Sequence, residues 1–190
     1  DLRLMPQVAA YYAELYRRGI AADFAHPEAD LSRYRLVIAP QLYLVTDRAV
    51  ENIKQYVHSG GTLLMSFFSG IVDEHDHVRL GGYPAPLQEL LGMHVEEIAP
   101  YGSAGHTNEI VFADGQRFTC GQWSDVIRLH DAESIAAYAH DYYAGTPAIT
   151  RHPFGEGVGY YVGTQPDAAG LRRLLDQVSA EAGLSPAQAQ

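Results

Sequence analysis

The length and composition are those of one ordinary globular domain. The chain has 190 residues, of which 47% are hydrophobic and 19% are charged, and a chain of this length buries roughly 70% of the surface that its unfolded form exposes. Its 23 acidic residues outnumber its 13 basic residues, for a formal net charge of −10. This excess of negative charge argues against nucleic acid or an anionic membrane surface as a partner.

The single cysteine, Cys120, excludes an intrachain disulfide and a zinc site built on cysteines. A lone cysteine suits a reducing compartment, so we expect a cytoplasmic location. The chain begins with Asp1 and leads almost at once into a helical pattern. We therefore expect it to be a piece of a longer protein.

The first half of the chain alternates between helical and strand patterns. Apolar residues three and four positions apart predict helices, and short apolar runs closed by Gly or Pro predict strands. In chain order the expected elements are a helix over Pro6–Arg18, strands over Ile20–Phe24 and Arg35–Ala39, a helix capped by Thr46, a strand over Thr62–Phe67, and a short helix from Pro84 to Gly92. This alternation predicts βαβ units and a parallel sheet.

From Val95 onwards the pattern changes to short β-type runs without helical periodicity. The runs cover Val95–Ile98, Glu109–Phe112, Gln116–Gly121, Val126–Leu129, Ser134–Ala139, Ala148–Arg151 and Gly159–Val162. Turn signals such as Asp114-Gly115 separate them at hairpin spacing, so we expect antiparallel or mixed strands added to the parallel sheet.

The end of the chain completes a single α/β domain over residues 1–183. Asp167 can cap a last helix, which Gly183 ends. The tail Leu184–Gln190 has the composition of a linker. One topological difficulty remains, because the chain opens with a helix, whereas the first strand of a doubly wound sheet is normally central. Either a first strand is missing or a later strand fills its place.

Three stretches together resemble a known family: Tyr11–Val45, Gly60–Gly92 and Tyr142–Thr164. The middle stretch contains the long pattern SGIVDEHDHVRLGGYPAPL. They look like the middle domain, called the trimerisation domain, of family 42 glycoside hydrolases, which are β-galactosidases. The resemblance covers nearly the whole chain.

This resemblance implies a non-catalytic domain of an enzyme that hydrolyses terminal β-galactosides, with both catalytic glutamates in a (β/α)8 barrel outside the chain. It also implies a sheet similar to those of flavodoxin and class I glutamine amidotransferases, with helices on both faces and a further strand upstream of Tyr11. The implied partners are two more copies, in a homotrimer, and the enzyme's own barrel.

A stand-alone hydrolase is the alternative function. Glutamine amidotransferases carry a nucleophilic cysteine on a tight turn after the third strand. The corresponding turn here reads Ser66-Phe67-Phe68-Ser69-Gly70, without a cysteine. Ser66 or Ser69 could act as a nucleophile, although FFSG is not the G-x-S-x-G elbow. A sugar-binding module that uses exposed tyrosines is a third possibility.

The loop Phe68–Pro84 carries the candidate interface. Its acidic residues and histidines crowd into Asp73–His77, and neighbours in one loop rarely oppose each other as the two carboxyls of a glycosidase do. They also lack zinc-site spacing, so we expect no catalytic residue, metal site or cofactor site in this chain. Apolar residues with a charged rim are typical of a protein contact. The candidate interface residues are Phe68, Ile71, Val72, Asp73, Glu74, Asp76, His77 and Arg79.

Two further expectations concern this loop. The alternative to an interface is a purely structural loop, in which Asp and His side chains bond the backbone and Arg79. The strand period of two also predicts that one ring of the pair Phe67 and Phe68 enters the core while the other faces the loop surface.

Overall fold

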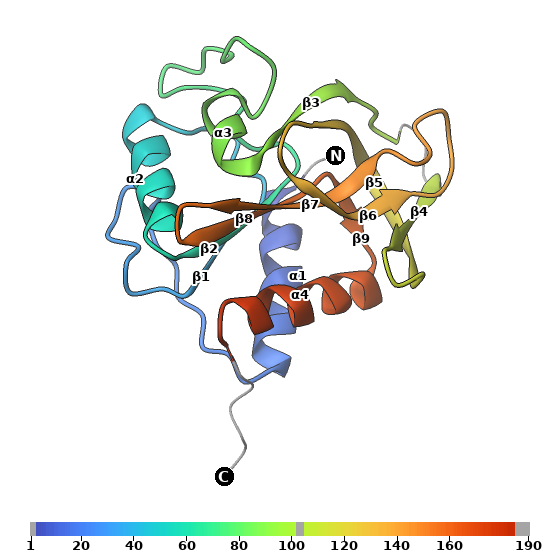
Figure 1. Cartoon of the computed structure of the whole chain (residues 1–190), viewed down its shortest axis with the longest axis horizontal. Helices are drawn as coiled ribbons and strands as arrows, with labels where there is room; N and C mark the ends of the chain where they lie inside the picture. Colours follow the sequence, from blue (N-terminus) through green and yellow to red (C-terminus); the bar gives the residue numbers. More distant parts are fainter. Residues whose placement is uncertain (1–2, 102–104, 185–190) are drawn as a thin grey trace.

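A mixed β-sheet with helices on both faces organises the molecule (Figure 1). The computed structural model describes residues 3–101 and 105–184. Its helices are α1 (Leu4–Arg17), α2 (Asp47–His58), the one-turn 3₁₀ helix η1 (Ala85–Leu87), α3 (Gln88–Leu91) and α4 (Ala168–Glu181). Its strands are β1 (Leu36–Ala39), β2 (Thr62–Ser66), β3 (Met93–Ile98), β4 (Thr107–Phe112), β5 (Arg117–Leu129), β6 (Glu133–Tyr138), β7 (Pro147–Phe154), β8 (Gly157–Val162) and β9 (Thr164–Pro166).

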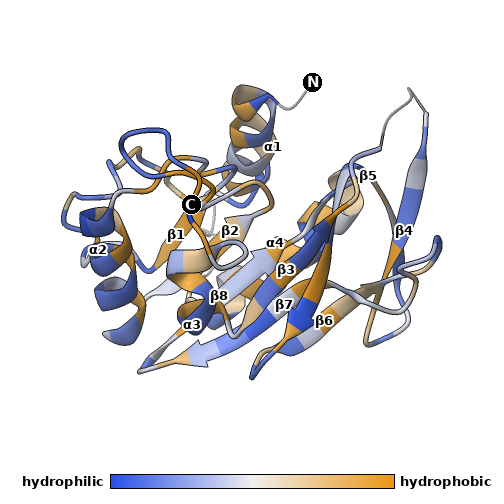
Figure 2. Cartoon of the chain, turned by 90° about the horizontal axis from the view of Figure 1, so that it is seen from above, coloured by the Kyte–Doolittle hydropathy of each residue, from blue (hydrophilic) through white to orange (hydrophobic). Residues whose placement is uncertain are grey.

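The parallel part of the sheet consists of β1, β2 and β8. Leu36 of β1 pairs with Thr62 of β2, which pairs on its other side with Val158 of β8. Strands β1 and β2 are orange in Figure 2, as expected for strands covered on both faces. A late strand, β8, thus completes the parallel set beside β2.

The antiparallel part continues from β8 in the order β7, β6, β4, β5 and β3, and β9 pairs with β5. The sequence predicted separate strands over Gln116–Gly121 and Val126–Leu129, and this was wrong, because β5 is one strand of 13 residues. Its pairing with β9 shifts register between Gly121 and Ser124, and Gln122 has a φ of 62°. A bulge of this kind bends a strand without ending it.

Alternate side chains of the central strands fill two cores. Leu64 and Tyr160 lie in the core under α4, and Leu63, Met65 and Tyr161 lie in the core under α2 and α3. All five side chains are fully buried. The sheet is therefore covered on both faces, as the helical patterns predicted.

The expected helix caps are present. The Thr46 Oγ1 accepts a hydrogen bond from the backbone N–H of Ala49 at 3.0 Å, and the Asp167 carboxylate accepts one from Gly170 at 2.8 Å. Such caps satisfy backbone donors that have no partner within the helix. No helix in the described part of the chain is long and apolar enough to cross a membrane.

The strand expected over Ile20–Phe24 does not form. This segment has no regular structure, and the Phe24 side chain is 79% exposed. Within the described residues β1 is the edge strand, with β2 as its only partner. An alternating pattern gives a strand only where a neighbouring strand accepts its hydrogen bonds, and here the described chain supplies none. Residues 185–190 of the expected linker lie outside the described part.

Candidate interface at the carboxyl edge of the sheet

Two loops leave the carboxyl ends of β1 and β2 and lie side by side. The backbone N–H of Gly70 donates to the Leu42 carbonyl at 2.8 Å, and that of Val45 donates to the Val72 carbonyl at 3.0 Å. Residues 67–84, called here the carboxyl-edge loop, are thereby fixed to residues 41–46. Loops at this end of an open α/β sheet are where such folds usually carry their interactions.

The two serines of the first turn are structural. The Ser66 hydroxyl accepts a hydrogen bond from the Gln41 N–H at 2.9 Å. The Ser69 hydroxyl accepts one from Leu42 at 2.9 Å and donates to the Ser66 carbonyl at 2.7 Å. Both residues are buried, and within the described residues no histidine is bonded to either hydroxyl. They hold two loops together and lack the adjacent base that a nucleophilic serine needs.

Phe67 and Phe68 divide as predicted. Phe67 is fully buried, and its ring stacks on Trp123 with centroids 5.9 Å apart. Phe68 is half-buried, has a φ of 59°, and stacks on Tyr43 with centroids 5.2 Å apart. The left-handed backbone at Phe68 turns the chain out of the strand, so its ring lies over the loops.

The acidic part of the carboxyl-edge loop is a self-bonded turn. The Asp73 carboxylate accepts hydrogen bonds from the backbone N–H groups of His75 at 2.8 Å and His77 at 2.9 Å. The hydrogen bond from the His77 N–H is the first cause that lowers the pKa of Asp73. Glu74, Asp76 and His77 are exposed. In the described chain no three potential ligands converge on a common point where a metal ion could bind.

Two of the predicted interface residues have other roles: Val72, predicted as an apolar contact, and Arg79, predicted as part of the polar rim. Val72 is 1% exposed, because it pairs with Leu44 and with Val78 and so points into the core. The Arg79 guanidinium donates to the Val45 carbonyl at 2.6 Å and pairs with Asp47 at 2.8 Å. Arg79 therefore anchors the loop, and it does so through Val45 and Asp47, not through the Asp and His side chains of the turn.

An exposed apolar group lies beside the acidic turn. Its side chains are Tyr43 at 38% exposure, Leu44 at 42%, Val78 at 67% and Leu80 at 92%. The Tyr43 hydroxyl donates to Asp76 at 3.3 Å, which joins the apolar group to the charged rim. We call these four residues, with Phe68, Ile71, Glu74, Asp76 and His77, the carboxyl-edge surface. The sequence alone did not identify Tyr43, Leu44, Val78 and Leu80 as contact residues. The signal for them was the presence of apolar residues in loops.

A buried carboxylate lies behind this surface. Asp125 of β5 is fully buried and accepts hydrogen bonds from Tyr83 at 2.5 Å, Trp123 at 2.7 Å and Tyr161 at 2.7 Å. Burial raises the pKa of Asp125 to about 6, although the three hydrogen bonds act to lower it. In the sequence, Asp125 directly precedes the β-type run Val126–Leu129, and this signal was missed.

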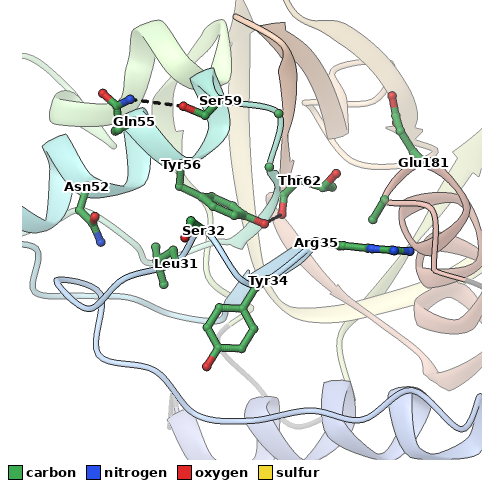
Figure 3. A pocket seen from close by; sticks show the side chains of 13 residues that line it. Leu31, Ser32, Tyr34, Arg35, Asn52, Gln55, Tyr56, Ser59, Thr62 and Glu181 are labelled. Carbon is green, nitrogen blue, oxygen red and sulfur yellow. Dashed lines mark hydrogen bonds between the residues drawn. The ribbon is translucent and has the colours of Figure 1, made fainter.

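A cavity of about 460 Å³ opens at the opposite, amino edge of the sheet (Figure 3). Tyr34, Tyr56 and residues from the ends of α2 and α4 line it. Polar groups of its lining are already bonded within the chain: Asn52 to Pro27 and Ala29, Tyr56 to Thr62, Arg35 to Gly183, and Gln55 to Ser59. This arrangement stabilises the chain and offers few free groups to a ligand.

The comparisons with known proteins agree on one family. Residues 1–185 match the model of the family described as the β-galactosidase trimerisation domain. The chain is 52% identical over 185 residues to β-galactosidase BgaB of Geobacillus sp. (strain Y412MC61), covering 97% of this chain and 27% of the relative. It is 41% identical to a β-galactosidase of Arthrobacter sp., covering 98% and 26%.

The fold agrees with this assignment. The crystal structure of the β-galactosidase from Bacillus circulans sp. alkalophilus superposes with a TM-score of 0.94 at 42% identity, over 97% of this chain and 28% of that one. The chain thus spans about a quarter of the length of these relatives. It belongs to the family of β-galactosidase trimerisation domains, found in glycoside hydrolases of family 42.

Proposed function

We propose that this chain is the non-catalytic, subunit-assembling part of a β-galactosidase. Its similarity to about a quarter of each β-galactosidase relative supports a catalytic barrel outside the chain. Ser66 and Ser69, the candidates for a hydrolase, have structural bonds instead. The parent enzyme would hydrolyse terminal β-galactosides, as the names of the relatives suggest. The cytoplasmic location stays a prediction from the lone cysteine.

The carboxyl-edge surface is the contact that we propose between subunits, in a homotrimer. The observation that carries the proposal is the exposure of Val78 and Leu80, at 67% and 92%, directly beside Glu74, Asp76 and His77. An apolar centre with a polar rim is the usual anatomy of a protein contact. Around a closed three-fold axis each contact is heterologous, so this surface would meet a different face of the next subunit.

The sheet supports the same assignment at the level of fold. Three parallel strands with helices on both faces are compatible with a flavodoxin-like or amidotransferase-like ancestor to which antiparallel strands were added. In such an arrangement, the carboxyl edge of the sheet, which holds the nucleophile in an amidotransferase, would form a contact between subunits here. Phe68 lies on the corresponding turn.

The test uses the intact enzyme that contains this chain. Leu80→Asp and Val78→Asp place a charge at the centre of the proposed contact and, because both side chains are exposed, leave the fold unchanged. We expect sedimentation velocity to show a shift from trimer to monomer, since a buried unpaired charge in a contact costs several kcal/mol. Met5→Asp on α1 is the matched control, because Met5 is 68% exposed. An unchanged trimer for both variants places the contact elsewhere.

A further inference from the structure

Two histidine side chains meet beside β3, the last strand in the order of the sheet. His94 lies on β3 and pairs across the antiparallel ladder with Arg128 of β5. His130 directly follows β5, and its backbone N–H donates to the Gly92 carbonyl at 2.9 Å, which continues the same ladder by one residue. Residues 94 and 130 are therefore diagonal neighbours on one face of the two strands, within reach of long side chains.

The two rings approach each other through nitrogen atoms. The His94 Nδ1 and the His130 Nε2 lie 3.0 Å apart, at a position exposed to solvent, and the ring centroids are 4.9 Å apart. Between two neutral imidazoles such a contact is a hydrogen bond, in which one ring donates and the other accepts. A metal ion in place of this proton would bind both nitrogens. The sequence does not display the pair, because its members are 36 positions apart.

The separation of the two nitrogens fits one class of metal ion. An imidazole nitrogen lies about 2.0–2.1 Å from a bound metal ion. Two such bonds at a right angle span about 2.9 Å, whereas two at the tetrahedral angle span about 3.3 Å. Right angles belong to the octahedral and square-planar geometries that Cu²⁺ and Ni²⁺ adopt. The observed 3.0 Å therefore matches adjacent positions around Cu²⁺ or Ni²⁺ more closely than positions around tetrahedral Zn²⁺.

The charges near the pair permit a cation to bind. Arg128, opposite His94, forms an ion pair with Glu96 at 2.5 Å, which compensates its positive charge. The net charge of −10 favours the approach of a cation to the chain as a whole. Among residues 3–101 and 105–184 no third histidine, cysteine or carboxylate converges with the two rings. Water would therefore fill the remaining positions around the ion.

We propose that His94 and His130 form a two-histidine site for a divalent copper or nickel ion. Both facing nitrogens must present lone pairs to the ion, so the ring that donates in the hydrogen bond changes tautomer. It loses the proton from its facing nitrogen to water and takes one up at its outer nitrogen, with no net release. Paired strands fix the backbone of both residues, so binding orders little more than the two side chains.

Isothermal titration calorimetry of the 190-residue chain with CuCl₂ and with NiCl₂ at neutral pH tests the site. We expect one equivalent of either ion in the tightest binding step. His94→Asn and His130→Asn should each weaken this step at least tenfold, since even the loss of an outer-shell partner costs about 10–100-fold in metal affinity. His75→Asn is the control, because His75 and His77 are also exposed but their ring centroids are 5.8 Å apart. Equal affinities in all four proteins overturn the proposal.

A second measurement on the wild type covers the case in which the variants do not fold. Electron paramagnetic resonance of one equivalent of bound Cu²⁺ counts the nitrogen ligands through their hyperfine couplings. We expect two imidazole nitrogens, and a spectrum with one or none overturns the proposal. Neither measurement needs self-association, and neither residue belongs to the carboxyl-edge surface, so the outcome is independent of whether the trimer proposal holds.

Discussion

Phe67→Ala provides the sharpest test of how the carboxyl edge is built. The Phe67 side chain is fully buried and stacks on Trp123. Truncation removes its whole transfer free energy and leaves a cavity, so we expect a loss of about 3–5 kcal/mol in the free energy of unfolding. That is a large share of the roughly 5–15 kcal/mol of a typical domain. Urea denaturation followed by circular dichroism measures it, with an expected drop in midpoint of roughly 1–2 M.

Phe68→Ala is the matched comparison, one residue along the chain. Its ring is half-buried and is held by the stack on Tyr43 and the edge contact with Trp123. Aromatic pairs of this kind contribute about 0.5–1.5 kcal/mol beyond area burial, so the loss in stability is well below that at Phe67. Equal losses at the two positions would refute the division between a core ring and a loop ring.

Three further predictions concern Glu14, two glycines and the activity of the chain. Glu14→Gln should destabilise the chain by about 1–3 kcal/mol at neutral pH, because the buried Glu14 carboxylate accepts hydrogen bonds from Arg18 and Arg172. Burial acts to raise the pKa of Glu14, but these bonds outweigh it, so the pKa is lowered. This difference from the wild type should vanish in urea titrations as the pH falls through the lowered pKa and Glu14 takes up a proton. Gly92→Ala should lower the free energy of unfolding by about 2–4 kcal/mol in the same assay, since φ is 62° and a Cβ would lie 2.6 Å from the His152 ring. Gly115→Ala is the control: its Cβ would meet open space, so the loss should be only about 1 kcal/mol. The chain alone should release no nitrophenol from a nitrophenyl galactoside; release above a heat-inactivated control would contradict its non-catalytic role.

Local patterns predicted most elements of this fold. Thr46 and Asp167 are the N-cap residues of helices α2 and α4, as the sequence predicted. The apolar run of β2 predicted a strand buried on both faces, and all five of its residues are buried. These features depend on hydrogen bonds and side-chain periodicity within one segment, which a sequence displays directly.

The candidate site was only partly predictable, for reasons visible in particular residues. The apolar and acidic residues of the loop after β2 marked it as a working surface, but Val72 was predicted as an apolar contact residue and Arg79 as part of the polar rim. Val72 faces inward because it pairs with Leu44, 28 positions earlier in the chain, and Arg79 bonds the carbonyl of Val45. Pairing between distant segments decides which way a loop residue points, and no local pattern encodes it.

The sequence by itself determined the family, the two-sided burial of the central strands and the ends of the main helices, because each depends on residue types at short spacing. Only the tertiary structure decided that Ile20–Phe24 has no strand partner among the described residues, that β5 bends instead of ending, and that Asp125 lies among Tyr83, Trp123 and Tyr161. A strand needs a neighbour to accept its hydrogen bonds, and a buried charge needs donors brought to it from other segments. Both conditions are properties of the folded arrangement in space.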